Sequence, residues 1–418
     1  MKIYKFGGAA VHSASGIKNL AQIIKLETTT LVIVVSAMGK ITNALEKVVK
    51  SYFEDLPDLK QNLQFVQDYH LNILNDLLES KDSLIYQEVS RLFTKLEDIL
   101  KEPPSLSYDF EYDRIVSYGE RLSTTIVSGY LNEIGLNNEW VDIRKLLITD
   151  NNFREGNVNA VLSKELMQNY FTASSATRFV TQGFIAGTIT GQTTTLGREG
   201  SDYTAAIIAN MLKAESVTIW KDVPGVMNAD PKCFDNVEII PRLSYKEAIE
   251  LSYCGASVIH PKTVKPLKNQ KITLYVKSFI HPLEPGSIIN DLNDHIEFPP
   301  IYIKKDKQVL LTLTPRDFSF IAEEKLSGIF HTLASFHVKA SLIQTSAISF
   351  SICADFNIIT FQTMFDALSK EYETVYNTDV ELITIRHYNQ EIIEALIGPR
   401  IVFVEQRNRL TASFVVPV

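Results

Sequence analysis

The sequence has little cysteine and no long apolar run. Among its 418 residues there are only three cysteines, Cys233, Cys254 and Cys353, and they form no CxxC or Cys/His spacing. This scarcity excludes a disulfide framework and a structural zinc site. Near the start of the chain the longest apolar run, Leu31–Val35, is far too short to cross a bilayer, and no secretory signal is evident. We therefore expect a cytoplasmic protein without a membrane partner.

The chain also lacks a surplus of basic residues. It carries 41 Lys and Arg against 49 Asp and Glu, which gives a formal net charge of -8. Nucleic acids and anionic membranes both require a basic surface, so neither is expected as a partner. An anionic substrate would have to be bound by a few well-placed lysine and arginine side chains.

Several signatures of common catalytic sites are missing. There is no GxxxxGK[ST] phosphate loop, no HExxH or HxxEH zinc motif and no GxSxG nucleophile motif. The eight histidines are scattered, and we assign each a structural role. Hydrophobic residues make up 45% of the chain and charged residues 22%, which is ordinary for a soluble protein, and the length predicts two or three domains.

The first 290 residues alternate short apolar runs with stretches of helical spacing. The apolar runs predict strands at Ile3–Phe6, Leu31–Val35, Ile115–Tyr118, Phe179–Thr181, Val217–Trp220 and Ile272–Val276. Their lack of polar alternation is typical of a largely parallel sheet buried on both faces. Helices are predicted at Ala44–Tyr52, Glu120–Ile134, Asp202–Lys213 and Tyr245–Leu251. The pattern predicts an α/β sandwich over residues 1–290, interrupted by a helical excursion at 58–102.

The composition changes after this α/β part. Residues 291–307 combine Asn, Asp, a Pro pair and a basic cluster, which predicts a linker. The region 308–418 then predicts a strand, a helix, two strands, a helix and a strand, at Val309–Thr314, Leu326–Leu333, Leu342–Thr345, Ser349–Ala354, Phe361–Leu368 and Val380–Arg386. This βαββαβ order is that of a ferredoxin-like unit. A final hairpin is predicted from Arg400–Val404 and Ala412–Val416.

Two glycine turns follow the first two predicted strands. Lys5 precedes Gly7 and Gly8 in KFGG, and VSAMG ends at Gly39 with Thr42 just beyond. Glycines let backbone N–H groups approach a phosphate closely, and a lysine adds positive charge. The carboxyl ends of strands are also where open α/β sheets bind ligands. Taken alone, each motif is equally explained as an ordinary turn.

The segment TTTLGREGSDYTAA, Thr193–Ala206, carries the densest set of informative residues. Its glycines lead into a predicted helix, for which Ser201 or Asp202 suits the N-cap position. Arg198 and the helix N-terminus would together form an anion site. A well-capped helix with a solvated arginine is the plainer alternative.

Two more segments place charged residues just after predicted strands. In YGERLST, Glu120 begins a helix, where the helix dipole stabilises a carboxylate or where the carboxylate could bind a substrate ammonium. WKDVPGVMNADPK contains Lys221, Asp222 and Lys232 around a Pro-Gly turn. This loop could receive a nucleotide, although turn chemistry explains most of its residues.

Together these segments resemble the aspartate kinases of the amino-acid kinase superfamily. The matching pieces, in the family's order, are KFGG, VSAMGKITN, YGERLST, TQGF, TTTLGREGSDYTAA, WKDVPGVMNADP and YCGASVIHPKT. They cover residues 1–290, and residues 308–418 resemble the family's ACT regulatory region. The resemblance implies an amino-acid kinase fold with a C-terminal ACT domain. It also implies transfer of the ATP γ-phosphoryl group to the side-chain carboxylate of L-aspartate with Mg²⁺, the first step toward lysine, threonine and methionine.

The resemblance also implies roles for individual residues. The catalytic residues would be Lys5 and Asp202. The residues that bind aspartate would be Thr42, Glu120, Arg198 and Ser201. The residues that bind the nucleotide would be Gly7, Gly8, Lys221, Asp222 and Lys232. No protein ligand to a metal is implied. Because the aspartate carboxylate has a pKa of about 3.9, it is already a nucleophile at neutral pH and no general base is required.

Some positions depart from the usual family pattern. Ala10 stands where a serine is usual, Glu199 where glycine is frequent, and Met227 where a tyrosine is usual. Ser257 occupies a position at which many relatives carry a lysine. Lys221 stands where threonine is common, and we infer that Lys221 supplies the charge that Ser257 lacks.

The predicted regulatory region is shorter than usual, because its roughly 110 residues are enough for one ACT unit rather than two. We expect the chain to form a homodimer through this region. The sequence leaves open whether an amino-acid effector binds to it. Two alternative functions are another amino-acid or carboxylate kinase of the same fold and a catalytically silent amino-acid-sensing ACT protein. The charged set Lys5, Glu120, Arg198 and Asp202 argues against the silent protein.

Overall fold

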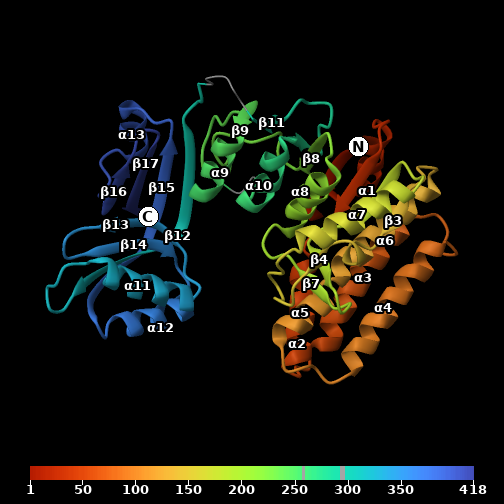
Figure 1. Ribbon diagram of the computed structural model, residues 1–418, viewed down its shortest axis with the longest axis horizontal. Helices are drawn as coiled ribbons and strands as arrows, with labels where there is room; N and C mark the ends of the chain where they lie inside the picture. Colours follow the sequence, from red (N-terminus) through yellow and green to blue (C-terminus); the bar gives the residue numbers. More distant parts are fainter. Residues whose placement is uncertain (257–258, 292–296) are drawn as a thin grey trace. The chain divides into compact units, whose positions relative to one another are not determined.

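The computed structural model describes residues 1–256, 259–291 and 297–418, which group into two compact units (Figure 1). The first unit comprises residues 1–226, 241–249 and 258–294, and the second comprises 227–240, 250–257 and 295–418. The sequence predicted the boundaries 1–290, 291–307 and 308–418, so each predicted domain was one continuous stretch of the chain. The packing instead assigns two segments from before residue 290 to the second unit, one of which contains the end of α9 (Tyr245–Cys254). No helix of the described residues combines the length and apolar character needed to cross a membrane.

An eight-stranded sheet lies at the centre of the first unit. In spatial order its strands are β3 (Glu139–Val141), β5 (Arg178–Gln182), β2 (Leu31–Val35), β1 (Lys2–Phe6), β8 (Ser216–Lys221), β10 (Thr273–Ser278), β11 (Ser287–Asn290) and β9 (Arg242–Ser244). The strands from β3 to β10 run parallel, whereas β11 is antiparallel to β10. A small second sheet contains β4 (Ile148–Thr149), β6 (Ile185–Thr188) and β7 (Thr193–Thr195). The predicted α/β fold with a mostly parallel sheet is confirmed.

Helices cover both faces of the main sheet. One face carries α8 (Gly200–Leu212), against which pack α7 (Ala160–Ala173) and α10 (Pro261–Gln270). The other face carries α1 (Ala14–Lys25) and α6 (Tyr118–Glu133). Beyond these lie α2 (Ile41–Phe53), α3 (Leu59–Leu77), α4 (Leu84–Lys101) and α5 (Tyr108–Val116). Figure 1 shows α3 and α4, which form the predicted helical excursion, as long helices at the outside of this unit.

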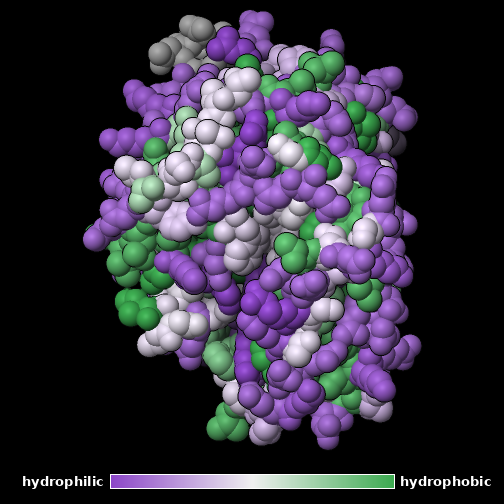
Figure 2. Space-filling model, turned by 90° about the vertical axis from the view of Figure 1, so that its right-hand side faces the viewer, coloured by the Kyte–Doolittle hydropathy of each residue, from purple (hydrophilic) through white to green (hydrophobic). Residues whose placement is uncertain are grey.

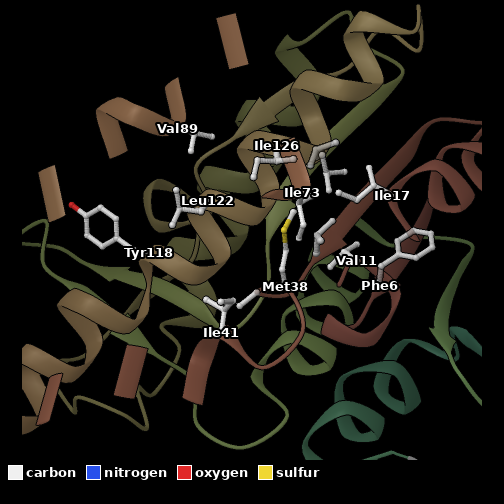
Figure 3. Close-up of a cluster of buried hydrophobic side chains, with 14 of the residues drawn as sticks. Phe6, Val11, Ile17, Met38, Ile41, Ile73, Val89, Tyr118, Leu122 and Ile126 are labelled. Atoms are coloured by element: carbon white, nitrogen blue, oxygen red, sulfur yellow. The ribbon is translucent and has the colours of Figure 1, made fainter. Parts of the chain in front are cut away.

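The alternation of strand side chains decides what each face of β1 presents. Phe6 joins a buried cluster with residues such as Val11, Ile17 and Met38, on the face covered by α1 and α6 (Figure 3). Because successive side chains in a strand point to opposite faces, Lys5 points the other way, toward α8. The apolar pattern of β1 therefore places a single lysine beneath the start of α8.

The prediction of a strand at Ile115–Tyr118 is wrong. These residues end α5 and begin α6, with Ser117 between the two helices. Ile115 and Val116 are fully buried, so the run is apolar for the same reason that a core strand would be. A short apolar run cannot by itself distinguish a buried helix from a buried strand.

The second unit contains a six-stranded antiparallel sheet. Its spatial order is β13 (Ala340–Thr345), β14 (Phe350–Asp355), β12 (Ile301–Pro315), β15 (Tyr372–Arg386), β17 (Thr411–Pro417) and β16 (Val404–Arg407). The helices α11 (Glu323–Ser335) and α12 (Ile358–Leu368) complete the order βαββαβ, which confirms the predicted ferredoxin-like unit. The last residues of the predicted linker, 301–307, belong to β12.

The two central strands, β12 and β15, are long enough to serve both halves of this sheet. Their pairing runs from Ile301 opposite Arg386 to Pro315 opposite Tyr372, with irregular register between Lys305 and Leu310. β14 pairs with the second half of β12, whereas β17 pairs with the second half of β15. The predicted single unit with an added hairpin is therefore incomplete, because the hairpin extends the same sheet into a second four-stranded half.

The second half of this sheet also has its own helix, α13 (Gln390–Ile397), which the sequence pattern did not predict. Figure 1 shows α13 at one end of the sheet and α11 and α12 at the other. The predicted strand Arg400–Val404 is displaced, since β16 begins only at Val404 and the turn falls at 408–410.

Candidate active site

The turns after β1 and β2 lie against each other at the carboxyl edge of the main sheet. The Gly39 N–H donates to the Gly8 carbonyl over 3.0 Å. A Cβ on Gly8 would lie 2.7 Å from the Gly39 oxygen and 2.8 Å from the Ala37 oxygen, so only glycine allows this approach. The two glycine turns singled out in the sequence therefore form one structure at the edge where α/β sheets bind ligands.

Two lysines share one buried carboxylate beside these turns. The Lys5 Nζ lies 2.5 Å from Asp202 Oδ1, and the Lys221 Nζ lies 4.0 Å from Asp202 Oδ2. Lys5 and Asp202 expose only 8% and 3% of their surface. Asp202 therefore faces two ammonium groups in a place with little water, where charge interactions are strong, and the Glu199 carboxyl lies near both lysines as well.

The helix α8 begins at this cluster. Its N-cap is Glu199, whose backbone is left-handed with a φ of 54°, so the predicted N-cap at Ser201 or Asp202 is wrong. Both residues lie instead in the first helical turn, where backbone N–H groups have no acceptor within the helix. Burial raises the pKa of the Glu199 carboxyl, although Lys221 opposes the effect. The helix end, with Lys5 beneath it, can bind an anion.

Glu120 lies in the first turn of α6, beside the turn that follows β2. Its Oε1 accepts a hydrogen bond from the Ala37 N–H at 3.2 Å, and its Oε2 is buried with no partner among the described residues. The side chain is 2% exposed, and this burial raises its pKa to about 8. A buried carboxyl oxygen without a donor is rare in folded proteins, so this one suits a donor from a ligand.

The other predicted site residues are described by their burial and their position in the fold. Thr42 is half-buried at the start of α2, Arg198 is exposed in the turn before α8, and Asp222 is exposed directly after β8. Lys232 belongs to the second unit, so its place beside a nucleotide stays a prediction. Ser257 lies outside the described residues.

Sequence reasoning assigned no role to the TQGF segment, which links the helices of the site. Phe184 adopts a φ of 68°, and its N–H donates to the Thr204 Oγ1 of α8 at 3.0 Å. Gln182 donates to the Thr124 Oγ1 of α6 at 2.9 Å. A Cβ on Gly183 would lie only 2.5 Å from the Ser201 Cβ. The Gly-Phe pair was visible as a motif, but the tight packing that requires it is a tertiary property.

Among the described residues, no group of three or more His, Cys, Asp or Glu side chains could hold a metal ion. Phosphate oxygens and water are the ligands that Mg²⁺ commonly takes in such sites.

Comparisons with known proteins agree with this geometry. A family model described as the amino acid kinase family matches residues 1–278. The chain is 30% identical to the lysine-sensitive aspartokinase 3 of Escherichia coli, over 84% of this chain and 78% of that protein. It is 32% identical to the chloroplastic aspartokinase 1 of Arabidopsis thaliana, again over 84% of this chain but only 63% of that relative's length.

Two solved structures of E. coli aspartokinase III are also similar to this chain. The complex with aspartate and ADP is 25% identical, with a TM-score of 0.84 over 100% of this chain and 96% of the other. The complex with lysine and aspartate is 26% identical, with the same TM-score and coverage. The similarity extends over both units of the chain.

Proposed function

This chain belongs to the amino acid kinase family, and we propose that it is an aspartate kinase, which transfers the ATP γ-phosphoryl group to the side-chain carboxylate of L-aspartate. The observation that carries this proposal is the shared Lys5–Asp202–Lys221 cluster beneath the N-terminus of α8. Two negatively charged reactants repel each other, so the catalyst must supply fixed positive charge and dipoles rather than a general base.

In this proposal Lys5, Asp202 and the glycine turn after β1 act on the transferring phosphoryl group. Lys5 neutralises the transferring phosphoryl group, and the backbone N–H groups of Gly7 and Gly8 donate to its oxygens. Asp202, 2.5 Å from the Lys5 Nζ, holds the lysine in position. Because these groups are fixed before the substrates bind, they need no reorganisation in the transition state.

Four residues would hold aspartate. Arg198 grips a carboxylate with its two-pronged guanidinium, which suits a carboxylate better than the point charge of a lysine. The unpartnered Glu120 Oε2 accepts a hydrogen bond from the substrate α-ammonium. Thr42 and Ser201 add hydroxyl contacts. Together they would present the side-chain carboxylate to the phosphate.

The nucleotide would be held by Lys221 and Asp222 of the first unit, with Mg²⁺ supplying further neutralisation of phosphate charge when it is bound. An amino-acid effector of this chain is supported by the complex of the E. coli relative with lysine and aspartate.

A hydroxamate assay for acyl phosphate, with ATP and L-aspartate, tests this function directly. We expect product with L-aspartate and little with L-glutamate or N-acetylglutamate in the same panel. A preference for another amino acid would instead favour a different carboxylate kinase. No product with any member of the panel would favour the silent amino-acid-sensing protein. Repeating the assay with lysine, threonine and both identifies an effector.

Replacing Lys221 with alanine tests its inferred nucleotide role. We expect the KM for ATP to rise about tenfold, since a charge-assisted hydrogen bond to phosphate contributes about 1.4 kcal/mol or more. The KM for aspartate should change little. Steady-state kinetics with each substrate varied in turn make the measurement. An unchanged KM for ATP would show that Lys221 does not supply the missing charge.

We further propose that the chain forms a homodimer through its second unit. The six-stranded sheet ends at β13 and β16, and free sheet edges favour pairing with another chain. Size-exclusion chromatography with light scattering should give twice the mass of one chain. A shortened chain that ends at Pro300 should elute as a monomer, and a dimer of the shortened chain would contradict the proposal.

A further inference from the structure

A cationic cavity lies in the first unit, lined by residues other than those assigned to phosphoryl transfer. Its volume is about 520 Å³, and its walls come from α4, α6, β3 and the segment that joins β3 to β4. Figure 2 views the molecule from the side on which α4 lies in Figure 1, and hydrophilic side chains predominate on this face. The cavity is lined by Arg91, Lys95, Arg121, Arg144 and Lys145, against the carboxylates Glu88 and Asp142.

Both carboxylates of the cavity already have partners. Arg144 makes two hydrogen bonds to Asp142, at 2.8 Å from Nε and 2.6 Å from Nη2. Arg91 pairs with Glu88 at 2.5 Å. The three remaining cations therefore concentrate positive charge in one cavity of a chain whose formal net charge is -8. Such a concentration favours an anion.

Arg121 is the residue that points most clearly to a ligand. It is only 9% exposed, and its Nε is buried with no hydrogen-bond partner among the described residues. Its guanidinium lies over the Tyr118 ring, 4.2 Å from the ring centre, and forms no ion pair within the described part of the chain. Burial lowers the pKa of Arg121, and the neighbouring Arg144 lowers it further. A hydrogen bond with Tyr118 and the attraction of Asp142 compensate this burial only in part, because the Nε keeps no acceptor among the described residues, and a bound anion would supply one.

The cavity also offers apolar surface beside these cations. Trp140 and Leu92 line it, together with Ile85 of α4. A Cβ on Gly129 would lie 2.5 Å from the Ile85 Cγ1, so glycine lets α4 and α6 approach closely at this point. Aromatic and aliphatic walls with a few convergent charges are typical of small-molecule sites.

We propose that this cavity is a second ligand site, which binds a small organic anion through Arg121, Lys95 and Lys145 and packs the apolar part of the ligand on Trp140. The shared chemistry is a carboxylate or phosphate group attached to an apolar body. The proposal does not depend on which phosphoryl acceptor the other site uses, because it concerns binding alone.

Isothermal titration calorimetry of the full chain at low ionic strength tests the proposal, with phenyl phosphate, benzoate, inorganic phosphate and neutral benzyl alcohol as probes. We expect saturable binding of phenyl phosphate or benzoate, weaker binding of inorganic phosphate and none of benzyl alcohol. The stronger of the first two identifies the phosphate or the carboxylate as the preferred group. Binding should persist in the Lys5→Ala variant, which separates this cavity from the phosphate site.

The Lys145→Glu variant, in which an exposed rim residue is reversed in charge, should weaken binding at least tenfold. Its control is Lys164→Glu, on α7, which changes the net charge equally outside the cavity and should leave binding unchanged. Arg121→Met should abolish binding. If that variant does not fold, Lys145→Glu decides alone. Equal affinities in Lys145→Glu and Lys164→Glu, or no saturable binding of any anion, would overturn the proposal.

Trp140 provides a second readout, because the chain has only two tryptophans. Phenyl phosphate should change the intrinsic fluorescence of the protein in proportion to the calorimetric binding. The Trp140→Phe variant should lose that change. A change that persists without Trp140 would place the ligand elsewhere and overturn the proposal.

Discussion

The Lys5→Ala enzyme should form aspartyl phosphate with a kcat about 10³-fold below that of the parent protein, since removing one preorganised electrostatic donor costs about this much. Lys5 is buried and its Nζ lies 2.5 Å from Asp202, closer than the Nζ of the other lysine of the cluster, Lys221, at 4.0 Å. The KM values should change much less than kcat, because in this proposal Lys5 stabilises the charge distribution of the transition state more than that of the bound substrates. Single-turnover hydroxamate assays make the measurement.

Two controls distinguish catalysis from folding in this experiment. Lys25→Ala removes an exposed lysine from α1 and should leave kcat unchanged. Asp202→Asn keeps the shape of the side chain but frees Lys5, and we expect a smaller loss than that of Lys5→Ala. Circular dichroism should be native for all three variants. A Lys5→Ala enzyme with an undiminished kcat would contradict the proposed mechanism.

The Glu120→Gln enzyme should bind aspartate poorly, with a KM raised roughly 10²-fold, because one partner of a buried charge pair is lost. The parent enzyme should also show a pH dependence that the variant lacks. With a pKa of about 8, only about a tenth of the Glu120 carboxyl is ionised at pH 7 in the free protein. The kcat/KM for aspartate should therefore rise between pH 7 and pH 8.5. Equal pH profiles for the two enzymes would contradict the assignment.

Ionisation of the Glu120 carboxyl should lower the stability of the folded protein, although it should raise kcat/KM for aspartate. Its pKa in the folded state, about 8, lies above its ordinary value of 4.5, so the folded protein binds the proton more tightly. This tighter proton binding contributes fully to the free energy of unfolding below pH 4.5. The contribution, roughly 5 kcal/mol at most, is lost as the pH rises to 8. Ligand-free Glu120→Gln should therefore be more stable than the parent at pH 8 and similar at pH 4.5. Urea unfolding of both proteins at both pH values measures this difference. A stability difference between parent and variant that is the same at pH 4.5 and pH 8 would contradict the prediction.

The outcome for individual segments shows which parts of the fold the local sequence pattern predicts. β2 was predictable because buried parallel strands favour continuous apolar runs, and Leu31–Val35 is fully buried. The run Ile115–Tyr118 is also buried but belongs to two helices, since burial alone does not fix the backbone. The ferredoxin-like order was predicted, whereas its continuation into a second half depends on the length over which β12 and β15 pair.

The sequence by itself determined the family, the α/β class and the identity of the charged residues at strand and helix ends, because these are local or ordered along the chain. Only the tertiary structure decided which of them meet. The pairing of Lys5 with Asp202 spans nearly 200 positions and arises from strand alternation in β1 and the docking of α8. The unpartnered oxygen of Glu120 and the cavity around Arg121 likewise exist only once helices have packed, since burial is a property of the whole fold.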